Sequence, residues 1–173
     1  MFQAFSRVIR ESSRHFVVLD TAPTGHTLLL LDATGAYHRD IVRHADADSR
    51  LRFVTPMMRL QDPQQTRILI VTLPETTPVL EAARLQDDLR RAGIEPWGWI
   101  VNASLAAAHT RHPLLRRRAA FEAEQTAKVR NELTGRLAVV PMQAAEPIGR
   151  ERLISLCRTT SATEDGGLHR VGV

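Results

Sequence analysis

Residues 16–27 have the sequence F-V-V-L-D-T-A-P-T-G-H-T and contain the features that decide the fold. The first four are apolar without interruption, which predicts a strand buried on both faces. The run stops at Asp20, and ligands of open parallel sheets bind beyond the carboxyl ends of the strands, so this carboxylate is well placed to hold a magnesium ion or its water. Gly25, in the following turn, lets the backbone approach a ligand closely. The alternative is an Asx-type turn, in which Asp20 and Thr24 cap backbone groups.

Further apolar runs alternate with segments of helical periodicity. Thr77 and Pro78 are typical of a helix start, and Gly93 is typical of a helix end. The pattern predicts an α/β fold, a parallel sheet with crossover helices. Strands are expected at 16–19, 67–74, 97–102 and 137–140, and helices at 1–13, 28–42, 77–92, 113–134 and 150–158, with a short helical turn at 57–60.

The composition is that of an ordinary soluble domain. The chain has 173 residues, a formal net charge of +4 and 43% hydrophobic residues, which is enough for one core. No apolar run reaches the roughly 18 residues that span a membrane, and the first 14 residues have no signal-peptide core. Cys157 is the one cysteine, which agrees with a reducing, cytoplasmic compartment. We expect a domain over residues 1–158 and a disordered tail over 159–173, which is poor in apolar residues.

The chain contains a single lysine, Lys128. A phosphate-binding loop of the G-x-x-x-x-G-K-[ST] type needs a lysine inside a glycine-rich turn between a strand and a helix. Lys128 lies instead in A-E-Q-T-A-K-V-R, which is helical in character and has no glycine. The 173 residues therefore contain no Walker A motif.

Several strings together resemble the arsenical pump-driving ATPase family, and most closely the C-terminal part of the second of its two homologous ATPase halves. The related ATPases that target tail-anchored membrane proteins share the first string. The resemblance implies a partial P-loop NTPase domain of the deviant Walker, SIMIBI-like type, without the Walker A region. The strings are D-T-A-P-T-G-H-T at 20–27, T-P-M-M-R-L-Q-D-P at 55–63, V-T-L-P-E-T-T-P-V-L-E-A at 71–82 and G-I-E-P-W-G-W-I-V-N at 93–102.

The resemblance assigns nucleotide-binding roles to five residues. It implies that Asp20 binds magnesium through water and that Gly25 lies near the terminal phosphate of ATP. Asn102 corresponds to an adenine-binding asparagine, and an amide offers the adenine edge both a donor and an acceptor. The segment that begins with Pro141 and Met142 resembles the one whose backbone flanks the adenine. Without the family, Asn102 is better explained as a turn residue at the end of a strand.

His26 resembles a ligand of the metalloid site in the pump ATPases, where arsenite or antimonite is an allosteric ligand. A neutral imidazole can serve as such a ligand, but a site of this type also uses cysteine thiolates. Cys157 matches none of them. The alternative is that His26 caps a helix.

The resemblance implies a C-terminal portion of an ATPase that couples ATP binding and hydrolysis to extrusion of arsenite or antimonite through an integral membrane pump. ATP and Mg²⁺ are the expected cofactors. No catalytic residue is assigned, because the family's phosphate loop and switch I aspartate precede the matching region. The chain alone is therefore expected not to support turnover. The expected partners are the pump subunit and the N-terminal ATPase portion or the second ATPase half. The expected location is the cytoplasm, at the inner face of the membrane where the pump recruits it.

Two other functions remain open. One is a non-catalytic module that binds the pump or an ATPase partner. The other is a tail-anchored protein targeting ATPase, with Met57 and Met58 as the client surface; these methionines are otherwise explained as core-filling residues.

Two clusters are better explained without a ligand. The arginines at 116–118 form a basic cluster, but no stacking aromatic residue is interleaved, so a solvated helix face is expected and nucleic acid is not. His109 and His112 are three residues apart, without a nearby cysteine or carboxylate to complete a metal site.

Overall fold

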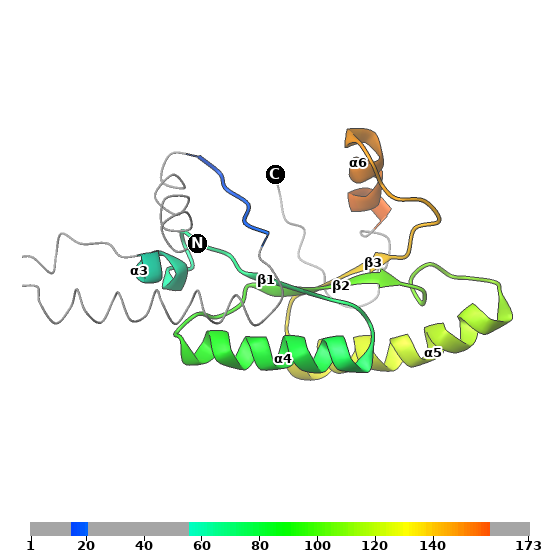
Figure 1. Cartoon of the computed structure of the whole chain (residues 1–173), viewed down its shortest axis with the longest axis horizontal. Coiled ribbons are helices and arrows are strands. Elements are labelled where there is room, and N and C mark those ends of the chain that lie inside the picture. Colours follow the sequence, from blue (N-terminus) through cyan, green and yellow to red (C-terminus); the bar gives the residue numbers. More distant parts are fainter. Residues whose placement is uncertain (1–14, 21–55, 160–173) are drawn as a thin grey trace, which may run out of the picture. The chain divides into compact units, whose positions relative to one another are not determined.

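The computed structural model describes residues 15–20 and 56–159 (Figure 1). The three strands form one sheet of order β1-β2-β3, and β2 and β3 run parallel. This arrangement confirms the predicted α/β class. The elements are α3 (Pro56–Gln61), β1 (Leu69–Thr72), α4 (Thr76–Arg91), β2 (Gly98–Ser104), α5 (Pro113–Lys128), the π-helix η1 (Val129–Leu133), β3 (Leu137–Pro141) and α6 (Arg150–Thr159).

The described residues divide into two compact units. The first contains residues 15–20, 56–70 and 80–97, and the second contains residues 71–79 and 98–159. In the part of the chain that the structure describes, no helix combines the length and the apolar character needed to cross a membrane.

In the first unit, a glycine ends α4. Gly93 has a φ of +74°, its N–H donates to the carbonyl of Arg90, and the Ile94 N–H donates to the carbonyl of Leu89. These two bonds form a Schellman motif, in which a residue with positive φ lets the last carbonyls of a helix be satisfied. The Gln61 side chain of α3 donates to the Ala92 carbonyl at 2.8 Å and so joins α3 to this helix end. The prediction that Gly93 stops the helix is confirmed.

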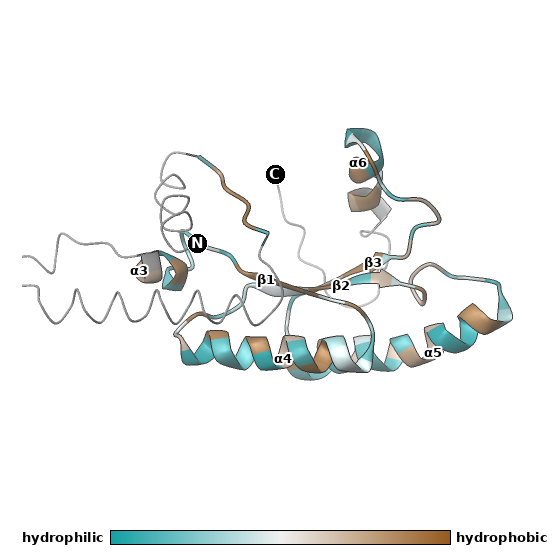
Figure 2. Cartoon of the chain, in the orientation of Figure 1, coloured by the Kyte–Doolittle hydropathy of each residue, from teal (hydrophilic) through white to brown (hydrophobic). Residues whose placement is uncertain are grey.

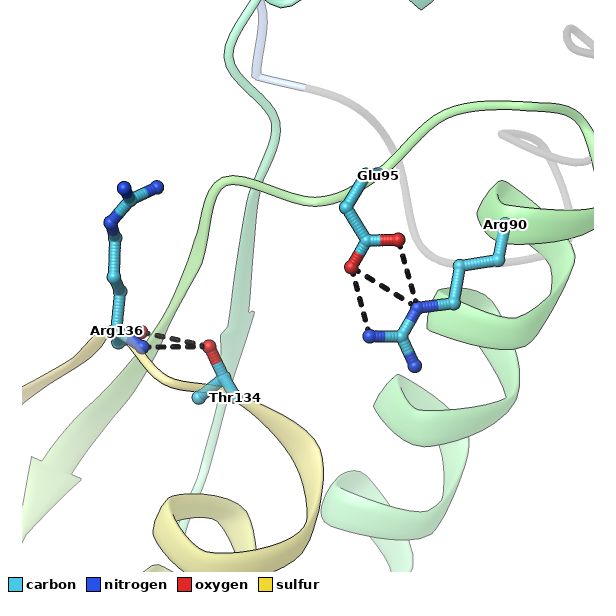
Figure 3. Close-up of polar contacts among 4 residues, drawn as sticks. All are labelled: Arg90, Glu95, Thr134 and Arg136. Carbon is cyan, nitrogen blue, oxygen red and sulfur yellow. Dashed lines mark hydrogen bonds and ion pairs between the residues drawn. The ribbon is translucent and has the colours of Figure 1, made fainter.

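A bidentate ion pair between Arg90 and Glu95 joins the end of α4 to the loop that follows it (Figure 3). Arg90 donates from Nε and from its terminal nitrogen to the Glu95 carboxylate over 2.9 to 3.2 Å. These hydrogen bonds lower the pKa of Glu95 below its usual value, and burial opposes the shift. Trp97 lies two residues after Glu95. The Arg67 guanidinium lies 5.3 Å from the centre of the Trp97 ring, a cation–π distance.

The second unit is built on the pairing of β2 with β3. Trp99 lies opposite Leu137, and Val101 lies opposite Val139. The Trp99 and Val101 side chains are buried, as is Val129 at the start of η1. Gly98 permits the close approach of the strands, because a Cβ there would lie 3.0 Å from the Arg136 carbonyl oxygen. Just before β3, the Thr134 hydroxyl exchanges two hydrogen bonds of 3.1 Å with the backbone of Arg136 (Figure 3).

The helices are amphipathic, whereas the strands are more uniformly apolar (Figure 2). On α4 the buried side chains are spaced three and four residues apart, which is helical spacing on one face. They are Val79, Ala82, Gln86 and Leu89.

The prediction of a buried strand at 16–19 is wrong. In the structure these residues belong to no strand, and the Phe16 side chain is 95% exposed. An apolar run favours extended backbone, but a strand also needs a neighbouring strand with which to pair. Among residues 15–20 and 56–159, none pairs with this segment.

The burial predicted for 67–74 is also wrong, because β1 alternates. Ile70 is 3% exposed and Val71 is 59% exposed, so only one face of this strand is covered. The continuous apolar sequence gave no sign of this, since it fits a strand covered on either face or on both.

The other predicted elements are present with shifted ends. The helix predicted at 113–134 changes to a π-helix after Lys128, and the helix at 77–92 begins earlier, at Thr76. The strand at 97–102 extends to Ser104, and the strand at 137–140 and the helix at 150–158 each extend one residue further. The helices predicted at 1–13 and 28–42 lie outside the described residues, as does all of the predicted disordered tail after Thr159.

Candidate functional site: a bulged strand end

The candidate site is built around a bulge near the carboxyl end of β2. Val101 pairs with Val139 and Ser104 with Pro141, so three steps along β2 correspond to two along β3. Asn102 and Ala103 occupy the irregular stretch, and Ala103 has a φ of +55°. A bulge leaves an extra residue unpaired and bends the strand, and it can redirect a side chain. Asn102 is exposed, and the extra residue lets Val101 and Ser104 both be buried although they are three positions apart.

The bulge also fixes the orientation of the Asn102 amide. Its Oδ1 accepts the N–H of Ala103 at 3.0 Å. An amide oxygen has a second lone pair, and the Nδ2 group carries two protons. The Asn102 Oδ1 therefore has one further acceptor position. Because Oδ1 faces the Ala103 N–H, the side of the amide that carries the two Nδ2 donors is also fixed.

The structure brings Pro141 and Met142 to the same place. Pro141 ends β3 and pairs with Ser104, and the Met142 N–H donates to the Ser104 carbonyl at 2.9 Å. The β2 and β3 arrows lie next to each other in Figure 1, consistent with this pairing. Three of the residues selected from the sequence thus gather at the carboxyl ends of two adjacent parallel strands, where ligands of such sheets bind.

Hydrogen bonds to both backbone and side-chain groups stabilise the turn that follows the bulge. The Ser104 hydroxyl accepts the Ala107 N–H at 3.2 Å, and the Ser104 carbonyl accepts the Ala108 N–H at 3.2 Å. The Leu105 N–H donates to the Glu122 carboxylate at 2.7 Å. Ser104, Leu105 and Glu122 are all buried, so water does not replace these bonds.

Glu122 belongs to a chain of charged groups that also reaches the loop after β1. Its other carboxylate oxygen lies 3.3 Å from the Arg118 Nε, one helical turn away on α5. The terminal nitrogen of Arg118 lies 2.6 Å from the Glu75 carboxylate. Sequence reasoning missed Glu122 and Glu75, and it treated Arg118 as part of a solvated cluster. A glutamate on a polar helix carries no sequence signal of burial.

Of the remaining predicted site residues, the structure describes Asp20. Asp20 is exposed and directly follows residues 16–19, which belong to no strand. Gly25 and His26 lie outside the described residues. Within residues 15–20 and 56–159, no three His, Cys, Asp or Glu side chains lie close enough to hold a metal ion. The exposed side chains of His109, His112 and Cys157 therefore complete no metal site in that part of the chain.

The groups at the bulge fit a purine base better than a metal ion or a phosphate. Asn102 offers a neutral amide, and Pro141 and Met142 offer backbone groups and an exposed thioether side chain. Magnesium prefers carboxylate and phosphate oxygens, and phosphates prefer cations or clustered N–H groups. An amide of fixed orientation beside exposed apolar atoms is suited to the polar edge and the flat face of a base.

Comparison with known proteins gives consistent relatives. A family model described as anion-transporting ATPase matches residues 1–59 and 45–160. The chain is 63% identical over 156 residues to the arsenical pump-driving ATPase of Acidiphilium multivorum, and 62% identical over 156 residues to that of Escherichia coli. Both matches cover 90% of this chain and 26% of the relative. A putative arsenical pump-driving ATPase of Halobacterium salinarum is 27% identical over 157 residues, which are 87% of this chain and 24% of that protein. The chain thus spans about a quarter of the length of these curated relatives.

Proposed function

This chain belongs to the anion-transporting ATPase family, and we propose that it forms the base-binding portion of an ATPase that drives extrusion of arsenite or antimonite through a membrane pump. The names of the relatives, arsenical pump-driving ATPases, support the metalloid substrate. The proposed partners are the pump subunit and the ATPase sequence that supplies the triphosphate cradle. The proposed location is the cytoplasm, at the membrane face where the pump lies.

One observation carries the nucleotide assignment: Asn102 is exposed at the bulge, two residues before Ser104, whose carbonyl receives the Met142 N–H. In this proposal Asn102 donates to and accepts from the polar edge of adenine, and the segment from Pro141 flanks the ring. The Ala103 N–H fixes which end of the amide donates. Adenine and guanine present donors and acceptors in opposite order on this edge, so an amide held in one orientation discriminates between them.

The proposal gives Asp20 and Gly25 roles at the triphosphate. Asp20 would hold the hydration shell of Mg²⁺, and Gly25 would let the backbone lie close to the terminal phosphate. Bound Mg²⁺ would supply charge neutralisation at the phosphates. His26 is the proposed metalloid contact, with ligands from other segments completing the set. All cationic side chains here except Lys128 are arginines or histidines, so the phosphate-loop lysines would come from the rest of the ATPase.

The first test is equilibrium binding of ATP and GTP by the expressed protein and by Asn102→Ala. We expect a preference for ATP, and a loss of ATP affinity of about tenfold in the variant, roughly 1.4 kcal/mol for one or two hydrogen bonds. Asn131→Ala removes an exposed amide from η1 and is the matched control. Equal affinity for ATP and GTP, or wild-type ATP binding by Asn102→Ala, would contradict the base site.

The second test addresses hydrolysis in the ATPase that includes the phosphate loop. Asp20→Ala should abolish magnesium-dependent ATP hydrolysis, and turnover that survives the substitution would rule out the proposed role. If the ATPase that includes the phosphate loop never hydrolyses ATP, and the isolated chain does not bind MgATP, the non-catalytic module becomes the better description. For the targeting-factor alternative, the two methionines differ: Met57 is 5% exposed and belongs to the core, whereas Met58 is 42% exposed and is the one of the pair that could contact a client.

A further inference from the structure

We infer that Glu122 is a positioning residue for base recognition: from α5, its buried carboxylate holds the strand end that presents Asn102. The inference rests on the proposed function, since it concerns the same base site. It also assigns a role to a charge that the proposed chemistry does not otherwise use.

The burial of Glu122 is the first reason. Its side chain is 3% exposed, and a carboxylate at such a position needs partners that replace water. The Glu122 carboxylate has two such partners, the Leu105 N–H at 2.7 Å and the Arg118 guanidinium at 3.3 Å. An ionised acceptor makes a hydrogen bond roughly twice as strong as a neutral one. Glu122 therefore fixes the Leu105 amide more firmly than another backbone group would.

The second reason is the short path from Leu105 to the base site. Leu105 follows Ser104, and the Ser104 carbonyl receives the Met142 N–H at 2.9 Å. On the other side, Ser104 follows the bulge that contains the exposed Asn102. One anchored amide thus fixes the end of β2 directly beside both groups proposed to contact the base.

The third reason is that a bulge needs such an anchor. Ala103 adopts a positive φ, which is unfavourable for a residue with a Cβ and must be imposed by the surroundings. The Leu105–Glu122 bond supplies a constraint two residues along the chain. The Arg118–Glu75 ion pair at 2.6 Å then ties the same helix to the segment that leaves β1.

The test compares ATP and GTP binding and amide hydrogen exchange in Glu122→Ala, Glu122→Gln and the control Glu124→Ala. Glu124 is an exposed carboxylate on the same helix. For Glu122→Ala we expect Leu105 amide exchange to accelerate by about tenfold or more, and the ATP-over-GTP preference to fall by about tenfold. Glu122→Gln keeps the shape and a neutral acceptor, so both effects should be about threefold. Glu124→Ala should match the wild type in both measurements.

A double variant separates positioning from general destabilisation. If Glu122 acts through Asn102, the Glu122 substitution should not reduce the ATP preference further in an Asn102→Ala background. An additive loss of preference would overturn the inference, as would an equal loss of ATP and GTP affinity. Should Glu122→Ala not fold, Glu122→Gln decides, and wild-type exchange and preference in that isosteric variant would also overturn it. If instead Asn102→Ala alone leaves ATP binding unchanged, the proposed base site itself fails.

Discussion

Gly93 shows how a single backbone position limits substitution. Alanine at a φ of +74° costs roughly 1–2 kcal/mol, and its Cβ would lie 3.0 Å from the Gln61 side-chain nitrogen. We expect Gly93→Ala to lower the free energy of unfolding by about that amount, measured by urea denaturation. Gly135→Ala is the control, because no atom lies within 4 Å of its added Cβ, and its change should stay within about 0.5 kcal/mol. Equal effects of the two substitutions would mean that the helix end does not need a positive φ.

The Arg90–Glu95 pair makes a prediction about pH. The pKa of Glu95 is lowered chiefly by its hydrogen bonds with Arg90. When a glutamate has a lower pKa in the folded state than in the unfolded state, its ionised form stabilises the folded state at pH values above the ordinary glutamate pKa. This stabilisation is lost as the pH falls through the lowered pKa. Both side chains are well exposed, so the contribution should be below about 1 kcal/mol.

Glu95→Gln should therefore flatten the acid side of the stability curve while changing little else. Urea unfolding from neutral to acidic pH measures the effect, and Glu81→Gln removes a similar exposed charge from α4 as the control. An unchanged acid limb in Glu95→Gln would show that the ion pair does not persist in solution.

At the scale of the element, β1 offers a test of which sheet face is covered. Ile70 and Val71 are neighbours in the chain but differ in exposure, 3% against 59%. Ile70→Ala should lower the free energy of unfolding by about 2–4 kcal/mol, and Val71→Ala by less than about 1 kcal/mol. Denaturant unfolding of the two variants checks the difference. Similar costs for both would mean that the two faces of β1 are equally buried.

The elements that could be predicted are those specified by local signals. Gly93 marked the end of α4, and W-G-W-I-V-N marked the core of β2, because turn chemistry and apolar runs act within a few residues. The bulge at Asn102 could not be predicted, since it is a mismatch between β2 and a strand more than thirty residues later. The burial of Glu122 was equally inaccessible, because it depends on where the Leu105 amide comes to lie.

At the scale of the whole molecule, the sequence identified the α/β class from the alternation of strands and helices. Asn102, Pro141 and Met142 were selected only through the resemblance to the family. The structure brings them together because the adjacent parallel strands β2 and β3 end at the same edge. The strand at 16–19 was predicted wrongly because strand pairing cannot be read from a local sequence pattern. Its residues specify an apolar strand but not the neighbour with which it would pair.

The proposed nucleotide should stabilise the whole protein. A ligand that binds only the folded state at a hundred times its dissociation constant adds about 2.7 kcal/mol to the free energy of unfolding. We expect MgATP to raise the midpoint of thermal unfolding, and the same concentration of MgGTP to raise it less. The Asn102→Ala variant should lose most of the difference between the two nucleotides. Equal shifts with both would contradict recognition of the base.

The bulge in β2 also decides how the gene tolerates the loss of a codon. Successive residues of a regular strand face opposite sides, so removing one residue reverses the side from which all later residues emerge. Ala103 is the exception, because its deletion removes the extra residue. Val101 and Ser104 are then two steps apart, as Val139 and Pro141 are, and the pairing of Ser104 with Pro141 is kept. Deletion of Ile100 has no extra residue to absorb it and would reverse one end of β2 relative to the other. An in-frame deletion at the bulge should therefore preserve the fold and alter only the presentation of Asn102, whereas a deletion three residues earlier should damage the core.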